Sequence, residues 1–141
     1  MNTVDVEFPE SLGHLALFAD LPAAEVEAIV GSCETVSFGA GEWIIRQGDP
    51  SSALHMILEG EVVTVIDDED RRVLSQGSFF GEVSVLLEEP TTASIVTRTP
   101  VKCLVVPASD VQDFLLAHPQ VMYRILKAEA RRLRTASESH S

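Results

Sequence analysis

The chain has 141 residues and a mass of 15.3 kDa, which suffices for one domain with a hydrophobic core but not for two. Its apolar fraction of 45% is ordinary for a globular protein, and its longest apolar run, residues 15–19, is too short to span a bilayer. The net charge of −12 divides into −15 over residues 1–120 and +3 over residues 121–141, and so acidic a body excludes DNA binding by this chain alone.

The amino-terminal segment, M-N-T-V-D-V-E-F-P-E, has neither the basic region nor the apolar region of a signal peptide. Cys33 and Cys103 each lie in an apolar stretch without a second cysteine nearby, which predicts two buried thiols. We therefore expect a soluble, cytoplasmic protein that does not bind membranes. Its expected parts are an N-terminal arm (residues 1–11), one domain (12–134) and a disordered tail (135–141).

The first expected helix is short and amphipathic. Val26, Ile29 and Val30 follow the i, i+3, i+4 spacing of one helix face. Pro22 suits the first turn of this helix, and Gly31 suits its end.

Between residues 34 and 106 the pattern changes to short alternating or β-branched runs separated by glycines. The expected strands are residues 35–38, 43–45, 54–58, 61–66, 73–74, 94–97 and 102–106. The expected core residues are Trp43, Ile45, Met56, Leu58, Val63 and Val105. The acidic stretch 67–70 is interpreted as a hairpin loop, because it lacks the D-x-D-x-D-G spacing and the closing glutamate of a calcium site.

Two helices are expected after the strands. Ser109 and Gln112 have the spacing of a capping box, which predicts a helix start at this point. Pro119 breaks that helix and opens another, which we expect to run to about residue 134. One face of the last helix carries Met122, Ile125, Leu126 and Leu133. The whole order predicts a mainly β fold, an antiparallel, jelly-roll-like β-roll with one N-terminal and two C-terminal helices.

Catalytic and metal motifs are missing from the sequence. The four histidines, His14, His55, His118 and His140, are scattered without an H-x-H pair, and His55 is expected to be a half-buried core residue. The sequence contains no G-x-S-x-G, P-loop or paired-cysteine motif. We therefore expect no enzyme activity, no metal site and no required cofactor.

The most informative stretch, residues 80–96, reads F-G-E-V-S-V-L-L-E-E-P-T-T-A-S-I-V. G-E-W-I-I-R-Q-G-D (residues 41–49) and M-I-L-E-G-E-V-V-T-V (residues 56–65) precede it. Over residues 12–133 these motifs resemble the cyclic nucleotide-binding domain family, whose phosphate-binding cassette reads F-G-E followed by P-R-(Thr/Ser/Ala)-A. The resemblance implies a β-roll with helices at both ends that senses cyclic AMP or cyclic GMP.

The resemblance also implies a ligand site in the cassette, residues 80–94. The implied ligand-binding residues are Phe80, Gly81, Glu82, Val83, Ser84, Thr91, Thr92 and Ala93. Residues 82–87 would form a short helix whose Val83 and Ser84 amides face the cyclic phosphate, and Gly81 would permit close backbone approach. Glu82 would accept a hydrogen bond from the ribose 2′-hydroxyl, and Thr92 would reach the phosphate or a guanine edge.

One position departs from the family pattern: Thr91 stands where the family has an arginine on the phosphate. An arginine clamps phosphate through two charged hydrogen bonds, whereas threonine offers one neutral hydroxyl. Burying the anion without its cation costs roughly 3–5 kcal/mol. Arg46, Arg98 or the pair Arg131 and Arg132 could supply the missing charge.

Two functions remain open at this point. The first is a stand-alone regulatory domain that binds cyclic AMP or cyclic GMP and signals through its last helix, either to an effector protein or through a homodimer formed by residues 119–134. The alternative is a module of the same fold that has lost the nucleotide and binds a protein partner or another small ligand. A basic group aimed at the cassette favours the first, and a filled or apolar cavity favours the second.

Overall fold

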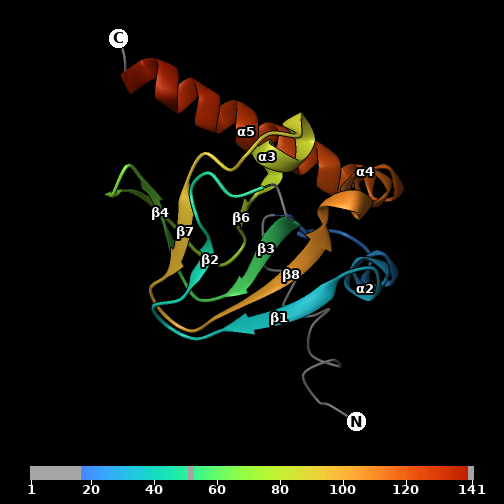
Figure 1. The fold of residues 1–141 in the computed structure, drawn as a ribbon. Helices are drawn as coiled ribbons and strands as arrows, with labels where there is room; N and C mark the ends of the chain where they lie inside the picture. The colour runs from blue at the N-terminus through green and yellow to red at the C-terminus, as the bar shows by residue number, and fades with distance from the viewer. Residues whose placement is uncertain (1–16, 51–52, 140–141) are drawn as a thin grey trace.

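Two four-stranded antiparallel sheets form a roll in the computed structural model, which describes residues 17–50 and 53–139 (Figure 1). The first sheet has the strand order β1-β8-β3-β6, and the second has the order β2-β7-β4-β5. The strands are β1 (Glu34–Phe38), β2 (Trp43–Ile45), β3 (Ala53–Glu59), β4 (Val62–Ile66), β5 (Glu69–Leu74), β6 (Phe79–Phe80), β7 (Ser94–Thr97) and β8 (Val101–Pro107). The mainly β antiparallel roll predicted from the alternating runs is confirmed.

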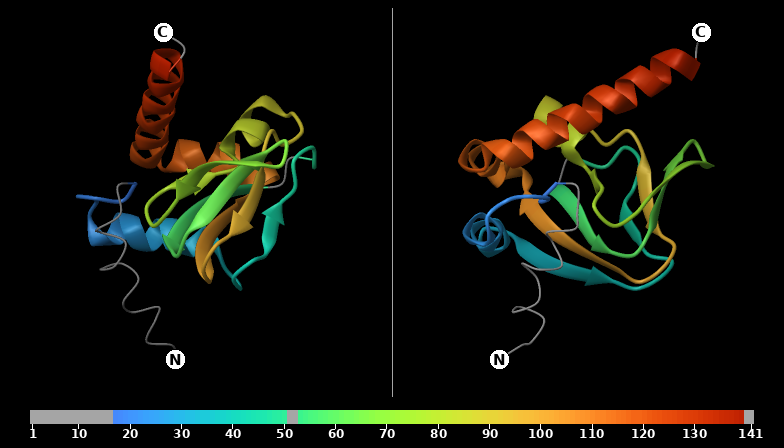
Figure 2. Two further views of the ribbon diagram at one scale, coloured as in Figure 1. Left: turned by 90° about the vertical axis from the view of Figure 1, so that its left-hand side faces the viewer. Right: turned by 180° about the vertical axis from the view of Figure 1, so that it is seen from behind.

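The helices of the described chain gather outside the roll. They are α2 (Ala23–Gly31), α3 (Glu82–Leu87), α4 (Ala108–Ala117) and α5 (Pro119–Ser139). Figure 2 shows α2 and α4 at the same end of the roll, with α5 starting beside α4 and ending away from both sheets. None of the described helices combines the length and hydropathy needed to cross a membrane.

Strand β3 is buried on both of its faces. Leu54, Met56 and Leu58 belong to a core shared with α2, α4 and α5, whereas Ala53 and Ile57 belong to a second core inside the roll. Successive side chains of a strand point to opposite faces, so a sheet covered on both sides needs a continuous apolar run. This explains the nearly unbroken apolar sequence of β3.

The strand predictions failed at two places, β5 and β6. Strand β6 was missed, because two phenylalanines are too short for a periodic pattern. Strand β5 starts at Glu69, so only Asp67 and Asp68 of the expected four-residue loop form the turn, both with positive φ. Because β5 is the edge strand of its sheet, it tolerates the charged residues that we interpreted as loop.

The helix boundaries also differ from the prediction. Helix α4 starts at Ala108 and has no side-chain cap, so the capping box at Ser109 was wrong, since Ser109 lies inside the first turn. Helix α5 continues to Ser139 rather than ending near residue 134, because the sequence that follows has no glycine or proline to stop it. Residues 135–139 are thus helical, and the expected arm 1–11 lies outside the described residues.

Among the expected core residues, Trp43 was wrong, since 46% of it is exposed and the Arg46 guanidinium lies 4.8 Å from its ring centroid. The other five expected core residues of the roll are buried. On α5, Ile125 is buried, but Leu126 and Leu133 are among the most exposed apolar residues of the described chain. The apolar stripe of α5 therefore does not pack on the roll along its whole length.

The two thiols are free, as expected, although only Cys103 is fully buried and Cys33 is half-buried. Burial raises the pKa of both thiols to about 12, so neither is activated as a nucleophile. His55 is more buried than expected and stacks on Phe80 with ring centroids 4.6 Å apart. Burial also lowers the pKa of His55 to about 4, which keeps the imidazole neutral inside the roll.

Candidate functional site

The cassette forms the turn and helix that its sequence predicts. Strand β6 ends at Phe80, Gly81 takes the left-handed conformation with φ +89°, and α3 begins at Glu82. A Cβ on Gly81 would lie 2.2 Å from the carbonyl oxygen of Ala53, so only glycine lets the turn approach β3 this closely. The glycine therefore fixes where the first turn of α3 sits against the roll.

A pocket of about 330 Å³ lies at the start of α3. All eight residues implied by the family resemblance line it, so the structure brings the two halves of the cassette together around one hollow. The other lining residues come from the second sheet, β6 and α5: Ile45, Thr64, Ile66, Arg71, Arg72, Leu74, Phe79, Ile95 and Arg132.

Three arginines line this pocket: Arg71, Arg72 and Arg132. Of the four arginines proposed from the sequence to replace the missing cation, only Arg132 is among them, and Arg46 instead stacks on exposed Trp43. The pocket thus contains positive charge despite the threonine at position 91.

Arg71 and Arg72 on β5 were missed from the sequence. Arg72 pairs directly with Thr64 of β4, and directly paired residues of an antiparallel ladder share a face. The register shifts after this pair, and the irregularity brings Arg71 to the pocket as well. If residues 69–72 had been recognised as strand, the sequence could have predicted that Arg72 faces the pocket. Arg72 is two residues from buried Leu74, and residues two apart in a strand point to the same side.

Arg72 is the less constrained of the two β5 arginines. The guanidinium of Arg71 lies 3.4 Å from the Glu69 carboxylate, and both side chains are largely exposed. Arg72 makes no ion pair with any residue of the described chain. Its charge can therefore be offered to an anion without breaking an existing pair.

Thr91 is buried and anchored to the turn after β2. Its hydroxyl donates to the carbonyl oxygen of Arg46 at 2.8 Å, and its amide donates to that of Asp49 at 2.8 Å. The carbonyl oxygen of Thr91 in turn accepts from the Gly48 amide at 2.8 Å. Because the single hydroxyl proton is already donated, Thr91 keeps only acceptor capacity, which a phosphate cannot use.

Glu82 is buried in the pocket wall and held by α5. Its carboxylate lies 3.2 Å from Arg132, which also bonds Glu129 at 2.9 Å. Burial, and to a smaller extent the nearby Glu129, raises the pKa of Glu82 from 4.5 to about 8, although the Arg132 charge opposes this shift. The carboxylate expected to bind ribose is thus already partnered.

Arg132 connects α5 to the cassette through several contacts. Besides the two carboxylates, it donates to the Ser78 hydroxyl and to the Phe79 carbonyl oxygen, each at 3.2 Å. Its guanidinium also lies 4.3 Å from the centroid of the Phe79 ring. The basic end of the last helix therefore reaches the domain, since Arg132 of α5 contacts Glu82 at the start of α3.

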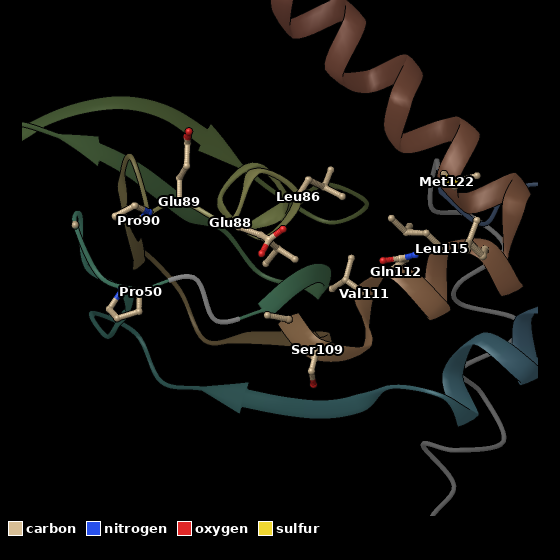
Figure 3. Close-up of a pocket in the computed structure, with 14 residues that line it drawn as sticks. Pro50, Leu86, Glu88, Glu89, Pro90, Ser109, Val111, Gln112, Leu115 and Met122 are labelled. Carbon is tan, nitrogen blue, oxygen red and sulfur yellow. The ribbon is translucent and has the colours of Figure 1, made fainter.

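A second, larger hollow of about 1000 Å³ lies on the other side of α3. Figure 3 shows Leu86 and Glu88 on one side of it and Val111, Gln112 and Leu115 of α4 on the other. It shares no lining residue with the cassette pocket. Nor do the described residues contain a group of three or more histidine, cysteine or acidic side chains able to hold a metal ion.

The model of the cyclic nucleotide-binding domain family matches residues 35–118, which is more than half of the chain. The chain belongs to this family. A cyclic nucleotide-binding domain is a regulatory domain type and is not itself catalytic.

Relatives of this cyclic nucleotide-binding domain include much longer proteins. It is 35% identical to a cGMP-dependent protein kinase of Plasmodium berghei (strain Anka), over 63% of this chain and 10% of the kinase. It is 33% identical to a cAMP-dependent protein kinase regulatory subunit of Emericella nidulans, over 64% of this chain and 23% of the subunit. The chain thus spans between a tenth and a quarter of these two relatives.

Among solved structures, the domain is similar to the Thermus thermophilus catabolite activator protein. The TM-score is 0.78 at 28% identity, over 88% of this chain and 61% of that one. The likeness covers most of the chain, and it supports the arrangement of the roll.

Proposed function

We propose that this domain binds cyclic AMP or cyclic GMP in the cassette pocket and transmits the binding event through α5. The observation that carries this proposal is that all eight cassette residues surround one pocket that also contains Arg72 and Arg132. The cation missing at position 91 is then replaced from β5, and the site keeps the positive charge that a cyclic phosphate needs.

In this proposal the phosphate lies against the first turn of α3. The first amides of a helix have no partner within the helix, and they carry the positive end of its dipole. The Val83 and Ser84 amides would therefore bind the phosphate oxygens, while Arg72 would approach them from the facing sheet. Thr92 is exposed at the mouth of the pocket and would contact the phosphate or the base.

The ribose would link the pocket to α5. A 2′-hydroxyl that donates to Glu82 competes with Arg132 for the same carboxylate, so ligand binding would weaken the contact that holds α5 in place. The released helix would then bind an effector protein or a second copy through residues 119–134. The exposed residues Tyr123, Leu126, Ala130 and Leu133 support a helix–helix contact, because their spacing alternates between three and four residues.

The proposed function is regulatory rather than catalytic and requires no cofactor. We place the domain in the cytoplasm, and its two free thiols support a reducing compartment. The acidic body argues against DNA or an anionic membrane as its direct partner.

The test is calorimetric titration of the chain with cyclic AMP and with cyclic GMP. Arg72→Gln should weaken binding by about tenfold or more, since it removes a charged hydrogen bond to phosphate. Arg98→Gln is the matched control, because Arg98 is exposed and does not line the pocket. Equal affinities of the two variants, or no binding of either nucleotide to the wild type, would reject the site.

The alternative is a member of the fold that has lost the nucleotide and binds a protein. Two observations favour it: the Thr91 hydroxyl is already donated to the backbone, and the Glu82 carboxylate is already paired. The groove between α3 and α4 would then be the binding surface, since Leu86 and Leu116 are exposed along it. This alternative would be supported if the wild type binds neither nucleotide and if Leu86→Glu loses a protein partner that the wild type binds.

A further inference from the structure

A third hollow, of about 510 Å³, lies beneath α5. One side of it is formed by the turn before β6, residues 76–78, and the other side by one face of α5. The residues that line it are Leu17, Gln76, Gly77, Ser78, Phe79, Arg124, Lys127, Ala128, Arg131 and Arg132. Only Phe79 and Arg132 are shared with the cassette pocket.

Among the described residues, four cations and no carboxylate line this hollow. Arg124, Lys127 and Arg131 follow one another at i, i+3 and i+7, so they project from the same face of α5. Like charges at this spacing repel and destabilise a helix unless an anion lies between them. In a chain of net charge −12, so local a concentration of positive charge points to a binding role.

Two of these cations are free to bind. Arg124 donates to the Leu17 carbonyl oxygen at 3.2 Å, and Arg132 is engaged with Glu82 and Glu129. Lys127, by contrast, has a cation–π interaction with the Tyr123 ring, at 5.7 Å from its centroid, and no hydrogen bond or ion pair with another described residue. Arg131 has no hydrogen bond or ion pair with the described part of the chain, and both side chains are exposed.

We propose that this hollow binds a small phosphorylated molecule, with its phosphate held between Lys127 and Arg131. The apolar side chains of Leu17, Phe79 and Ala128 form a surface for the uncharged part of such a ligand. The two cations that would hold the phosphate are distinct from those of the cassette, because neither Lys127 nor Arg131 lines the cassette pocket.

A small ligand fits better than an extended polyanion. The hollow is bounded by Leu17, α5 and a single turn, and all of its basic residues lie within residues 124–132 of α5. Nucleic acid or an anionic membrane would also meet the body of the domain, where residues 1–120 carry a net charge of −15.

The test is a titration with inorganic pyrophosphate, followed by the backbone amide resonances of the full chain at an ionic strength held constant with chloride. Saturable shifts are expected at residues 76–79 and 124–131. The double variant Lys127→Gln/Arg131→Gln should weaken pyrophosphate binding at least tenfold, because it removes two charged contacts. Arg134→Gln is the matched control, since Arg134 is exposed on the same helix but does not line the hollow.

Three results would overturn the proposal. Shifts that do not saturate and are equal in the wild type, the double variant and Arg134→Gln would show that these cations only balance the negative charge of residues 1–120. Shifts confined to residues 81–84 would assign pyrophosphate to the cassette. Binding to phosphatidylglycerol vesicles without saturable binding of pyrophosphate would assign the surface to a membrane.

The proposed function and this site can fail separately. The double variant Lys127→Gln/Arg131→Gln should bind cyclic nucleotide as the wild type does, and Arg72→Gln should bind pyrophosphate as the wild type does. Loss of both ligands in either variant would contradict two independent sites.

Discussion

At the scale of single residues, the cassette shows how much of the site the sequence can predict. Its eight residues are close in the chain and carry a recognisable pattern, so their common location around one pocket was predictable. The hydrogen bond from Thr91 to the Arg46 carbonyl was not, because it joins residues 45 positions apart. The same holds for Arg132 and Glu82, which are 50 positions apart and meet only after the roll has formed.

The buried carboxyl of Glu82 should make stability depend on pH. Because its folded-state pKa is raised from 4.5 to about 8, the folded chain binds a proton that the unfolded chain releases in this window, so stability falls as pH rises. Glu82→Gln removes this loss. The difference in free energy of unfolding between Glu82→Gln and the wild type should therefore shift in favour of the variant, by at least about 1.4 kcal/mol, from pH 5 to pH 8. Urea denaturation at both pH values measures it.

Glu89→Gln is the control for this comparison, because Glu89 is an exposed carboxyl outside the cassette pocket. Parallel pH dependence of the wild type and Glu82→Gln would mean that Arg132 keeps Glu82 ionised throughout.

Restoring an arginine at position 91 should strengthen nucleotide binding. Thr91→Arg adds a second charged clamp beside Arg72, in place of a hydroxyl that is donated to the backbone, and a hydrogen bond to a charged group contributes about 1.5–3 kcal/mol. We therefore expect a gain in affinity of about one to two decades in a calorimetric titration with cyclic AMP or cyclic GMP. Glu89→Gln controls for the change in overall charge, because it also makes the net charge more positive by one. An equal gain in both variants would show that the effect is long-range rather than local.

At the scale of elements, predictions succeeded where a periodic apolar pattern was long enough and failed at short or charged elements. Strands β3, β7 and β8 carry the pattern of buried sheet, and all three were expected. Strand β6 has two residues, and β5 owes its extended form to its pairing with β4. The start of α4 was missed by two residues, because the N-cap is Pro107 rather than the expected Ser109.

The turn from β6 into α3 should depend on Gly81. Gly81→Ala places a Cβ against the Ala53 carbonyl oxygen and also strains a φ of +89°. Gly48→Ala is a close control, because Gly48 has the same φ and open space around its Cβ position. Strain alone costs about 1–3 kcal/mol. Chemical denaturation should show a clearly larger loss for Gly81→Ala, and equal losses would contradict the close approach.

The exposed seam of α5, formed by Tyr123, Leu126, Ala130 and Leu133, should control association. Leu126→Glu/Leu133→Glu places charge at two apolar positions of the seam and should abolish a homodimer formed through residues 119–134. Light scattering over a range of protein concentrations measures this, with and without cyclic nucleotide. Leu116→Glu is a control with an exposed leucine on α4 instead. A monomer at all concentrations in the wild type would leave an effector protein as the proposed partner of α5.

At the scale of the whole molecule, the domain consists of two parts of opposite charge, the acidic roll and the basic helix α5. The acidic roll holds the cassette pocket, and the basic helix crosses it, contacting the cassette through Arg132 and forming one side of the third hollow. The charge division was visible in the sequence. Only the fold shows that part of this charge is directed at Glu82.

The most direct test of the central claim is to locate the bound nucleotide by amide chemical shifts. Titrating the isotope-labelled chain with cyclic AMP and cyclic GMP should shift the amides of Gly81, Glu82, Val83 and Ser84 first, because the phosphate would bind at the start of α3. Shifts along α5 near Arg132 should accompany them as its pair with Glu82 is exchanged. Shifts confined to the groove between α3 and α4, or none at millimolar nucleotide, would contradict nucleotide binding in the cassette.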